Sequence, residues 1–113
     1  MTESARPTVI RADAEHRYEI RVDGALAGIT EYRDHGGQRV FFHTEVDEAY
    51  AGQGLAGELV RQALTDVRES GLRVVPVCSY VGRYVRRHAE FADLVDPATP
   101  ELASWLDRQL TAS

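Results

Sequence analysis

Polar and apolar residues alternate through much of the first half of the chain, which is the pattern of strands that are buried on one side. In the first of these runs the apolar positions are Tyr18, Ile20 and Val22. The alternation, together with many β-branched and aromatic residues, predicts strands over residues 16–22, 25–32 and 38–46. Asp23-Gly24 and the turn residues 34–37 separate them, so consecutive strands should pair as an antiparallel meander.

The apolar period changes to that of a helix after Gly54. One stripe of this predicted helix holds Leu55, Leu59, Val60, Ala63, Leu64 and Val67. Gly71 is suited to cap the helix in the left-handed conformation, and residues 72–77 then form a short apolar run typical of a buried strand. Because a helix-long crossover normally links parallel strands, we expect this strand to lie parallel to residues 38–46.

Two further helices are predicted near the end of the chain. Residues 79–88 place their apolar residues on one face, at Tyr80, Val81, Tyr84, Val85 and His88. Thr99-Pro100-Glu101 combines a helix N-cap with a proline at the first helical position. The apolar face of that terminal helix should cover its own sheet or meet a second copy of the chain.

These elements predict a single α/β domain over residues 1–113, with a mixed sheet of the α+β kind. The length of 113 residues is usual for one domain. In order, we expect an antiparallel meander, a β-α-β unit, a helix and a terminal helix within residues 99–113. Residues 1–8 are expected to form a loose arm.

Composition narrows the possible classes of function. Thirteen basic residues, all arginine, stand against eighteen acidic ones, and the net charge of −5 argues against a nucleic-acid-binding protein. The sequence has no apolar run as long as a membrane span and no apolar core of a signal peptide near its start, so we expect a cytoplasmic protein without a membrane partner. The single cysteine, Cys78, excludes an internal disulfide, and the four histidines lack metal-ligand spacing.

A glycine-rich turn between the strand 38–46 and the following helix carries the clearest chemical signal. Gly52, Gly54 and Gly57 leave backbone N–H groups exposed at the positive end of a helix dipole, which is a site for phosphate or pyrophosphate. The turn lacks the Gly-Lys-Ser/Thr ending of a P-loop. Its glycine spacing matches a dinucleotide-binding fingerprint, but antiparallel strands precede it where that fold has a parallel unit. The alternative is a helix start that uses glycine for tight packing.

Residues Ala51-Gly52-Gln53-Gly54-Leu55-Ala56 resemble motif A of the GNAT superfamily of acetyl-CoA-dependent N-acetyltransferases, written Q/R-x-x-G-x-G/A. Gly54 and Ala56 match the last two fixed positions, whereas Ala51 stands where glutamine or arginine is expected. The similarity extends over residues 41–95 to a minimal single-domain branch of the superfamily. Because motif A holds phosphate mainly through backbone N–H groups, the departure at Ala51 leaves the mechanism possible.

The resemblance implies a GNAT-like acyl-CoA N-acyltransferase fold and a binding site for acetyl-CoA. In this family the strands on either side of the motif A helix splay apart, and the pantetheine arm lies between them. Glu45 and Val46 would line the thioester end. The pyrophosphate would be held by the main chain of Ala51, Gly52, Gln53, Gly54, Leu55, Ala56 and Gly57. The helix 79–88 would flank the other side with Tyr84 and Arg87, and Arg83 and Arg86 are further candidates for phosphate contacts; the alternative for these arginines is a solvated helix face.

Acetyl transfer needs a nucleophile and a proton for the departing thiolate. Cys78 lies where the strand 72–77 gives way to a helix, a position that activates thiols, so it is a candidate acetyl-accepting nucleophile. The alternatives are a buried small hydrophobe and direct attack of the amine on acetyl-CoA, the usual route of the family. By the resemblance, Tyr80 would protonate the thiolate, with Tyr84 as a second candidate; both would otherwise simply pack on the sheet.

The acceptor is expected to be an amine on a protein, a peptide or a small molecule. Family members usually have helices between the first two strands, whereas Asp23-Gly24 joins the predicted strands directly, which should leave the acceptor side open. His43 and Glu45 share one side of their strand, and either could take the proton of the amine, although both could be simple surface residues. The predicted function is transfer of an acetyl group from acetyl-CoA to an amine by a monomer or homodimer. The alternatives are a non-catalytic acyl-CoA-binding module and an interaction protein that binds no cofactor.

Overall fold

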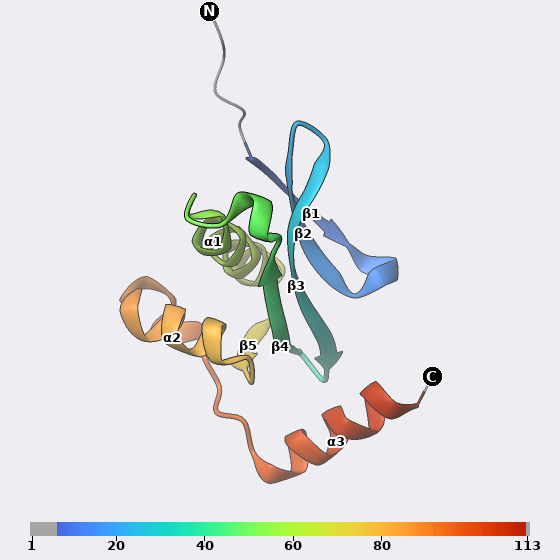
Figure 1. The fold of residues 1–113 in the computed structure, drawn as a ribbon. Coiled ribbons are helices and arrows are strands. Elements are labelled where there is room, and N and C mark those ends of the chain that lie inside the picture. Colours follow the sequence, from blue (N-terminus) through green and yellow to red (C-terminus); the bar gives the residue numbers. More distant parts are fainter. Residues whose placement is uncertain (1–6, 113) are drawn as a thin grey trace, which may run out of the picture.

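The computed structural model describes residues 7–112 of the chain. Its strands are β1 (Pro7–Ala12), β2 (Arg17–Val22), β3 (Ala25–His35), β4 (Gln38–Val46) and β5 (Arg73–Pro76). Its α-helices are α1 (Leu55–Glu69), α2 (Ser79–Arg87) and α3 (Pro100–Thr111), and its 3₁₀ helices are η1 (Asp13–Glu15), η2 (Glu48–Tyr50) and η3 (Ala89–Leu94). The strands lie in numerical order in one sheet, antiparallel from β1 to β4 and parallel between β4 and β5 (Figure 1).

The predicted strands and helices are all present, and the parallel pairing of the strand after the first helix is confirmed. The prediction of a loose arm over residues 1–8 is wrong for Pro7 and Thr8, which begin β1; residues 1–6 lie outside the described part of the chain. β1 pairs with β2 from Pro7↔Val22 to Ala12↔Arg17. The meander therefore has four strands, and η1 joins the first two. Asp23-Gly24, which we expected to join the first two strands, instead connects β2 to β3.

The turn between β3 and β4 is shorter than the predicted turn over residues 34–37. β3 continues to His35, and only Gly36 and Gly37 form the turn, with φ of 51° and 82°. Asp34 stays in the strand because its carboxylate receives two hydrogen bonds from Arg39, at 2.7 and 2.9 Å. A cross-strand ion pair thus extends the hairpin where local sequence favoured a turn.

The two faces of the sheet are covered by different helices. The predicted stripe of α1, from Leu55 to Val67, is buried against the aromatic and aliphatic residues of one face, among them Tyr18, Ile20 and Phe41. On the other face, Leu102 and Leu106 of α3 pack against Val40 and Val75. The terminal helix therefore covers its own sheet. Figure 1 shows α3 at the end of β4 that is remote from the turn leading into α1.

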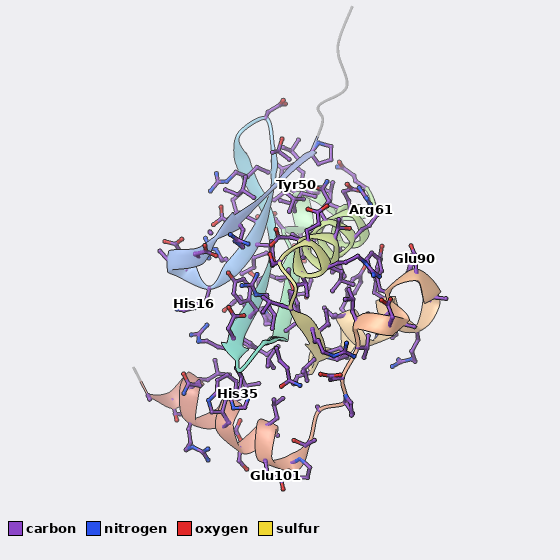
Figure 2. The ribbon with its side chains drawn as sticks, turned by 180° about the vertical axis from the view of Figure 1, so that it is seen from behind. His16, His35, Tyr50, Arg61, Glu90 and Glu101 are labelled. Carbon is purple, nitrogen blue, oxygen red and sulfur yellow. The ribbon has the colours of Figure 1, made fainter. Side chains whose placement is uncertain are left out.

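Trp105 extends the packing of α3 toward the turn between β3 and β4. Its ring lies 4.3 Å from the ring of His35, measured between centroids, and Figure 2 shows His35 at the end of the sheet beside α3. Thr99 caps the helix by accepting a hydrogen bond from the amide of Leu102 at 3.1 Å, as its sequence predicts. The helix is thus fixed both at its start and along its apolar face.

A buried arginine organises the polar groups under α1. Arg39 is 6% exposed, and its Nη1 donates to the Tyr18 hydroxyl at 2.7 Å. The same hydroxyl donates to Asp66 at 2.6 Å, and the guanidinium lies 4.1 Å above the centre of the Tyr32 ring. Burial is the main cause that raises the pKa of Tyr32 to about 12, and it also raises the pKa of Tyr18, so both phenols are neutral at physiological pH.

Within residues 7–112, no helix combines the length and apolar character that crossing a membrane requires.

Candidate functional site

A cleft opens where β4 and β5 separate. β5 pairs only with the first part of β4, from Gln38↔Arg73 to Phe41↔Pro76, and β4 then continues to Val46. After β5 the chain turns into α2, and the amide of Cys78 donates to the carbonyl oxygen of Phe41 at 2.8 Å. Beyond this contact the edge of β4 that faces away from β3 pairs with no strand in the described residues. Its main-chain groups are therefore available to a ligand.

The glycine turn forms one wall of the cleft. Asp47 caps η2 by accepting a hydrogen bond from the amide of Ala49 at 2.9 Å, and the chain then turns through Gly52 and Gly54, with φ of 81° and 75°. Only glycine adopts such angles readily, so these two residues set the path into α1. Figure 2 places Tyr50 immediately before this turn.

The amides of the turn and of the first helical turn have no hydrogen-bond partner within the described part of the chain. Among residues 7–112, no acceptor binds the N–H groups of residues 52–57, and the first intrahelical bond is donated by Glu58, to the carbonyl of Gly54 at 3.2 Å. Ala51 differs, because its amide already donates to Glu48 at 3.1 Å. The expected amide donor set therefore begins at Gly52, and Ala51 contributes only to the lining of the cleft.

Two adjoining hollows make up the cleft. The glycine-loop hollow, of about 140 Å³, is lined by Val46, Tyr50, Ala51, Gly52, Gly54, Leu55, Ala56, Gly57 and Tyr80. The α2 hollow, of about 350 Å³, is lined by Gly54, Gly57, Glu58, Tyr80, Arg83, Tyr84, Arg87 and His88. They share Gly54, Gly57 and Tyr80, so together they run from the end of β4 to the end of α2. Of the predicted cofactor-binding residues, Gln53 is in the turn but lines neither hollow.

The predicted site residues of α2 differ in how far they are exposed to the cleft. The Tyr80 hydroxyl is 3.8 Å from the position that a Cβ on Gly57 would take, so it stands at the junction of the two hollows. Tyr84 is buried and stacks on His88, with ring centroids 3.8 Å apart. Burial, followed by the charge of Glu90, raises the pKa of Tyr84. The side chain of Arg87 is exposed on the rim of the α2 hollow.

The charges around the α2 hollow favour an anion. Arg83, Arg87 and His88 line it, and Glu58 is the only carboxylate among its described lining residues. Arg61 donates two hydrogen bonds to the Glu58 carboxylate, at 3.2 and 2.6 Å, and Figure 2 shows Arg61 on α1. These bonds, with one from Gln62, lower the pKa of Glu58 and offset its charge. Glu58 was not among the residues predicted for the site. The sequence signal that could have found it is its position in the first turn of α1, four residues after Gly54.

Cys78 is the N-cap residue of α2, two residues before Tyr80, and it lines neither hollow of the cleft. Its side chain is half-buried, and its thiol donates to the hydroxyl of Thr44 across a distance of 3.4 Å. Thr44 was not among the predicted site residues. It is brought to Cys78 by the bond between Cys78 and Phe41 and by the alternation of side chains along β4, a long-range arrangement without a local signal.

His43 and Glu45 lie on the other side of the sheet from this cleft. The register of β3 and β4 shifts by one residue between Phe41 and His43, so beyond the shift Thr44 and Val46 face α1. His43 Nε2 and Glu45 Oε1 are 2.8 Å apart, in agreement with their predicted common side. The Glu45 side chain borders a separate hollow of about 190 Å³ together with Leu26, whereas Val46 borders both that hollow and the glycine-loop hollow.

Gly28 of β3 packs closely against the end of β4, so a substitution at Gly28 tests how rigidly β4 is held. A Cβ there would lie 2.9 Å from the carbonyl oxygen of Glu45 and 2.9 Å from Cγ2 of Val46. Because a backbone atom has to move, we expect Gly28→Ala to lower the free energy of unfolding by about 1–3 kcal/mol, measured by urea denaturation. Gly82→Ala is the control, since its nearest atoms are 3.5 and 3.9 Å away. Equal stability of the two variants would contradict the tight contact.

The fold and the family of the chain follow from comparison with known proteins. A solution structure of a GCN5-like protein from Staphylococcus aureus has the same fold, with a TM-score of 0.62 over 82% of this chain and 91% of that one, at 18% identity. This structure confirms the expected fold class. A model of the GCN5-related N-acetyltransferase family matches residues 17–94, and the chain belongs to that family.

Curated relatives carry the name Protein NATD1. The mouse protein (Mus musculus) is 30% identical over 89 residues, which cover 76% of this chain and 81% of the relative. The human protein (Homo sapiens) is 30% identical over 89 residues, with coverage of 76% and 79%. The family match ends at residue 94, before α3 begins.

Proposed function

We propose that the chain is a single-domain N-acetyltransferase that transfers an acetyl group from acetyl-CoA to an amine on a protein or peptide. The observation that carries the proposal is the row of amides from Gly52 to Gly57, which have no hydrogen-bond partner among residues 7–112 and lie at the start of α1 beside the cleft. A pyrophosphate fits such a row because several N–H groups and the helix dipole converge on it.

The described residues fit the other parts of coenzyme A as well. The open edge of β4 at Glu45 and Val46 offers main-chain groups for the amides of a pantetheine arm. Tyr84 and Arg87 flank the far end of the cleft, where Arg83 adds a second positive charge for the nucleotide phosphates. Bound in this way, acetyl-CoA would supply an acyl thioester beside Cys78 and Tyr80.

Two residues are placed to take part in the transfer. In the direct route, the amine nitrogen bonds to the acetyl carbon and the C–S bond breaks. The Tyr80 hydroxyl donates a proton to the departing sulfur, the nitrogen gives up a proton to water, and water then reprotonates Tyr80. In the covalent route, the Cys78 sulfur loses its proton and bonds to the acetyl carbon, and coenzyme A leaves as the protonated thiol. The amine then attacks the acetyl-cysteine, its C–S bond breaks, and the amine proton restores the Cys78 thiol. Tyr80 lines both hollows, and Cys78 caps the helix that carries Tyr80, which supports the assignment. Experiment has to separate the two routes.

The short connection between β1 and β2 favours an acceptor amine that is exposed on a larger molecule. The first two strands are joined by the short 3₁₀ helix η1, three residues long, so no α-helix lies between them within the described residues. The same openness favours a second candidate function, an acyl-CoA-binding module without transfer. This alternative predicts binding of coenzyme A with no acetylated product.

Mass spectrometry with acetyl-CoA and a peptide library tests the transfer. We expect Tyr80→Phe to lower the rate of acetylation about 10²-fold with little change in the affinity for coenzyme A, because only the proton donor is removed. Tyr32→Phe, which removes a hydroxyl remote from the cleft, is the matched control. Acetylation of Cys78 that passes on to amines, and its loss in Cys78→Ala, would establish the covalent route. Binding without any product in the wild type would favour the non-catalytic module.

A further inference from the structure

The edge of the sheet formed by β1 has no partner in the described part of the chain. β1 pairs with β2 from Pro7↔Val22 to Ala12↔Arg17 without a register shift, and no strand among residues 7–112 pairs with its other edge (Figure 1). Natural sheets usually protect such an edge with bulges, prolines or several charges. β1 has no bulge, and it offers only Pro7 at its start and Arg11 near its end, so its main-chain groups are accessible to another strand.

The middle of this edge is apolar and carries no uncompensated charge. Ile10 is 42% exposed although its side chain is large and aliphatic. Arg11 is the only charged residue of β1, and its guanidinium already pairs with Asp66 at 2.9 Å and with Asp13 at 3.0 Å. A neighbouring strand would therefore bury apolar surface without having to neutralise a charge.

A hollow of about 430 Å³ joins this edge to α1. It is lined by Val9, Ile10, Arg11, Tyr18, Arg61, Gln62, Thr65, Asp66 and Glu69. Arg61 and Glu69 lie four residues on either side of Thr65, so this stretch of α1 has opposite charges at its two ends. Arg61 binds Glu58 through Nε and Nη2, which leaves its Nη1 available, and Glu69 forms no ion pair within residues 7–112. The charge pattern is thus complementary to a copy of itself that runs in the opposite direction.

We propose that β1 is a dimer interface, at which two copies of the chain pair their β1 strands antiparallel about a two-fold axis near Ile10. In this arrangement Ile10 packs against Ile10 of the second copy, and each Arg11 faces Val9 instead of the other Arg11. The same axis turns Arg61 of one copy toward the side on which the other carries Glu69. A second copy fits this edge better than an unrelated strand, because symmetry supplies both the matching length and the reversed charges.

The proposed dimer leaves the candidate site accessible in both copies. β1 and β5 lie at opposite edges of the sheet, and the cleft opens where β4 and β5 separate. α3, which covers the other face of its own sheet, takes no part in the contact. The interface therefore goes beyond the proposed function and does not depend on it.

Sedimentation equilibrium tests the association, and we expect the wild type to form a dimer that dissociates on dilution. Ile10→Lys places two like charges against each other at the axis and should raise the dissociation constant at least about tenfold. Leu26→Lys is the matched control, because Leu26 is 41% exposed but lies at the start of β3. The control should associate like the wild type.

Hydrogen exchange measured by mass spectrometry locates the interface in the wild type, so the result does not depend on the folding of a variant. The amides of residues 8–12 should exchange more slowly at concentrations where the dimer forms than after dilution, whereas residues 79–88 should not change. A wild type that stays monomeric at millimolar concentration overturns the proposal, even if it binds an extended peptide. So does a dimer in which β1 gains no protection, or an equal loss of association in both lysine variants.

Discussion

Gly54→Val should weaken the binding of coenzyme A at least about tenfold, which corresponds to about 1.4 kcal/mol. Gly54 has φ of 75° as the N-cap of α1, a conformation that β-branched residues strongly disfavour. Relief of this strain rotates the peptide groups on either side of residue 54. Their N–H groups then turn away from the proposed position of the pyrophosphate. Isothermal titration calorimetry with coenzyme A measures the effect.

Gly24→Val is the matched control for this experiment. Gly24 has φ of 82° in the turn between β2 and β3, and a Cβ there meets no atom within 4 Å, as at Gly54. The control should therefore carry a similar backbone strain but leave the affinity for coenzyme A unchanged. If Gly54→Val bound as tightly as the wild type, or if both variants lost affinity equally, the proposed role of the glycine-turn amides would be wrong.

Arg39→Met should lower the free energy of unfolding by about 3 kcal/mol, the largest stability loss that we expect from a single polar side chain here. The substitution removes the ion pair with Asp34 and the hydrogen bond to Tyr18, and it leaves polar groups under α1 without their partner. Although burial opposes the charge of Arg39, its hydrogen bond to Asp34 and the Tyr18 hydroxyl outweigh this effect and raise its pKa. Urea denaturation at neutral pH measures the loss.

Arg68→Met provides the comparison for Arg39. Arg68 also forms a two-bond pair with a carboxylate, that of Asp93, but both side chains are well exposed. Its removal should change stability far less, because water replaces the lost contacts. Arg39→Lys should fall between these variants, since an ammonium group cannot form the parallel pair of bonds with Asp34. Similar losses at Arg39 and Arg68 would contradict the importance of burial.

Local pattern was sufficient for the elements that carry a clear period. The stripe of α1, the three alternating strands and the capped start of α3 all have the residues and spacing that their conformations require. β1 was missed because its residues, PTVIRA, do not alternate between polar and apolar, and it is stabilised by pairing with β2, a contact outside its own sequence. The length of the turn predicted at residues 34–37 was too great for a related reason. The ion pair between Asp34 and Arg39 joins two strands and is not visible in local sequence.

In the candidate site, too, some features follow from local sequence and others from contacts between distant segments. Glycine positions predicted the location of the glycine turn, because positive φ angles depend on the residue itself. The use of the Ala51 amide by Glu48 and the contact between Cys78 and Thr44 depend on how separate segments meet. The register shift near Phe42, which turns Val46 instead of Glu45 toward α1, was equally hidden.

The packing of α3 bears on the cleft although the helix does not touch it. Leu102 and Leu106 rest on Val40 and Val75, which are direct partners across the joint between β4 and β5. β4 and β5 separate one residue beyond this pair, so α3 packs against the two strands at the point where they diverge. The separation of β4 and β5 is thus constrained from the opposite face of the sheet, by a helix that lies beyond the residues matched by the family model.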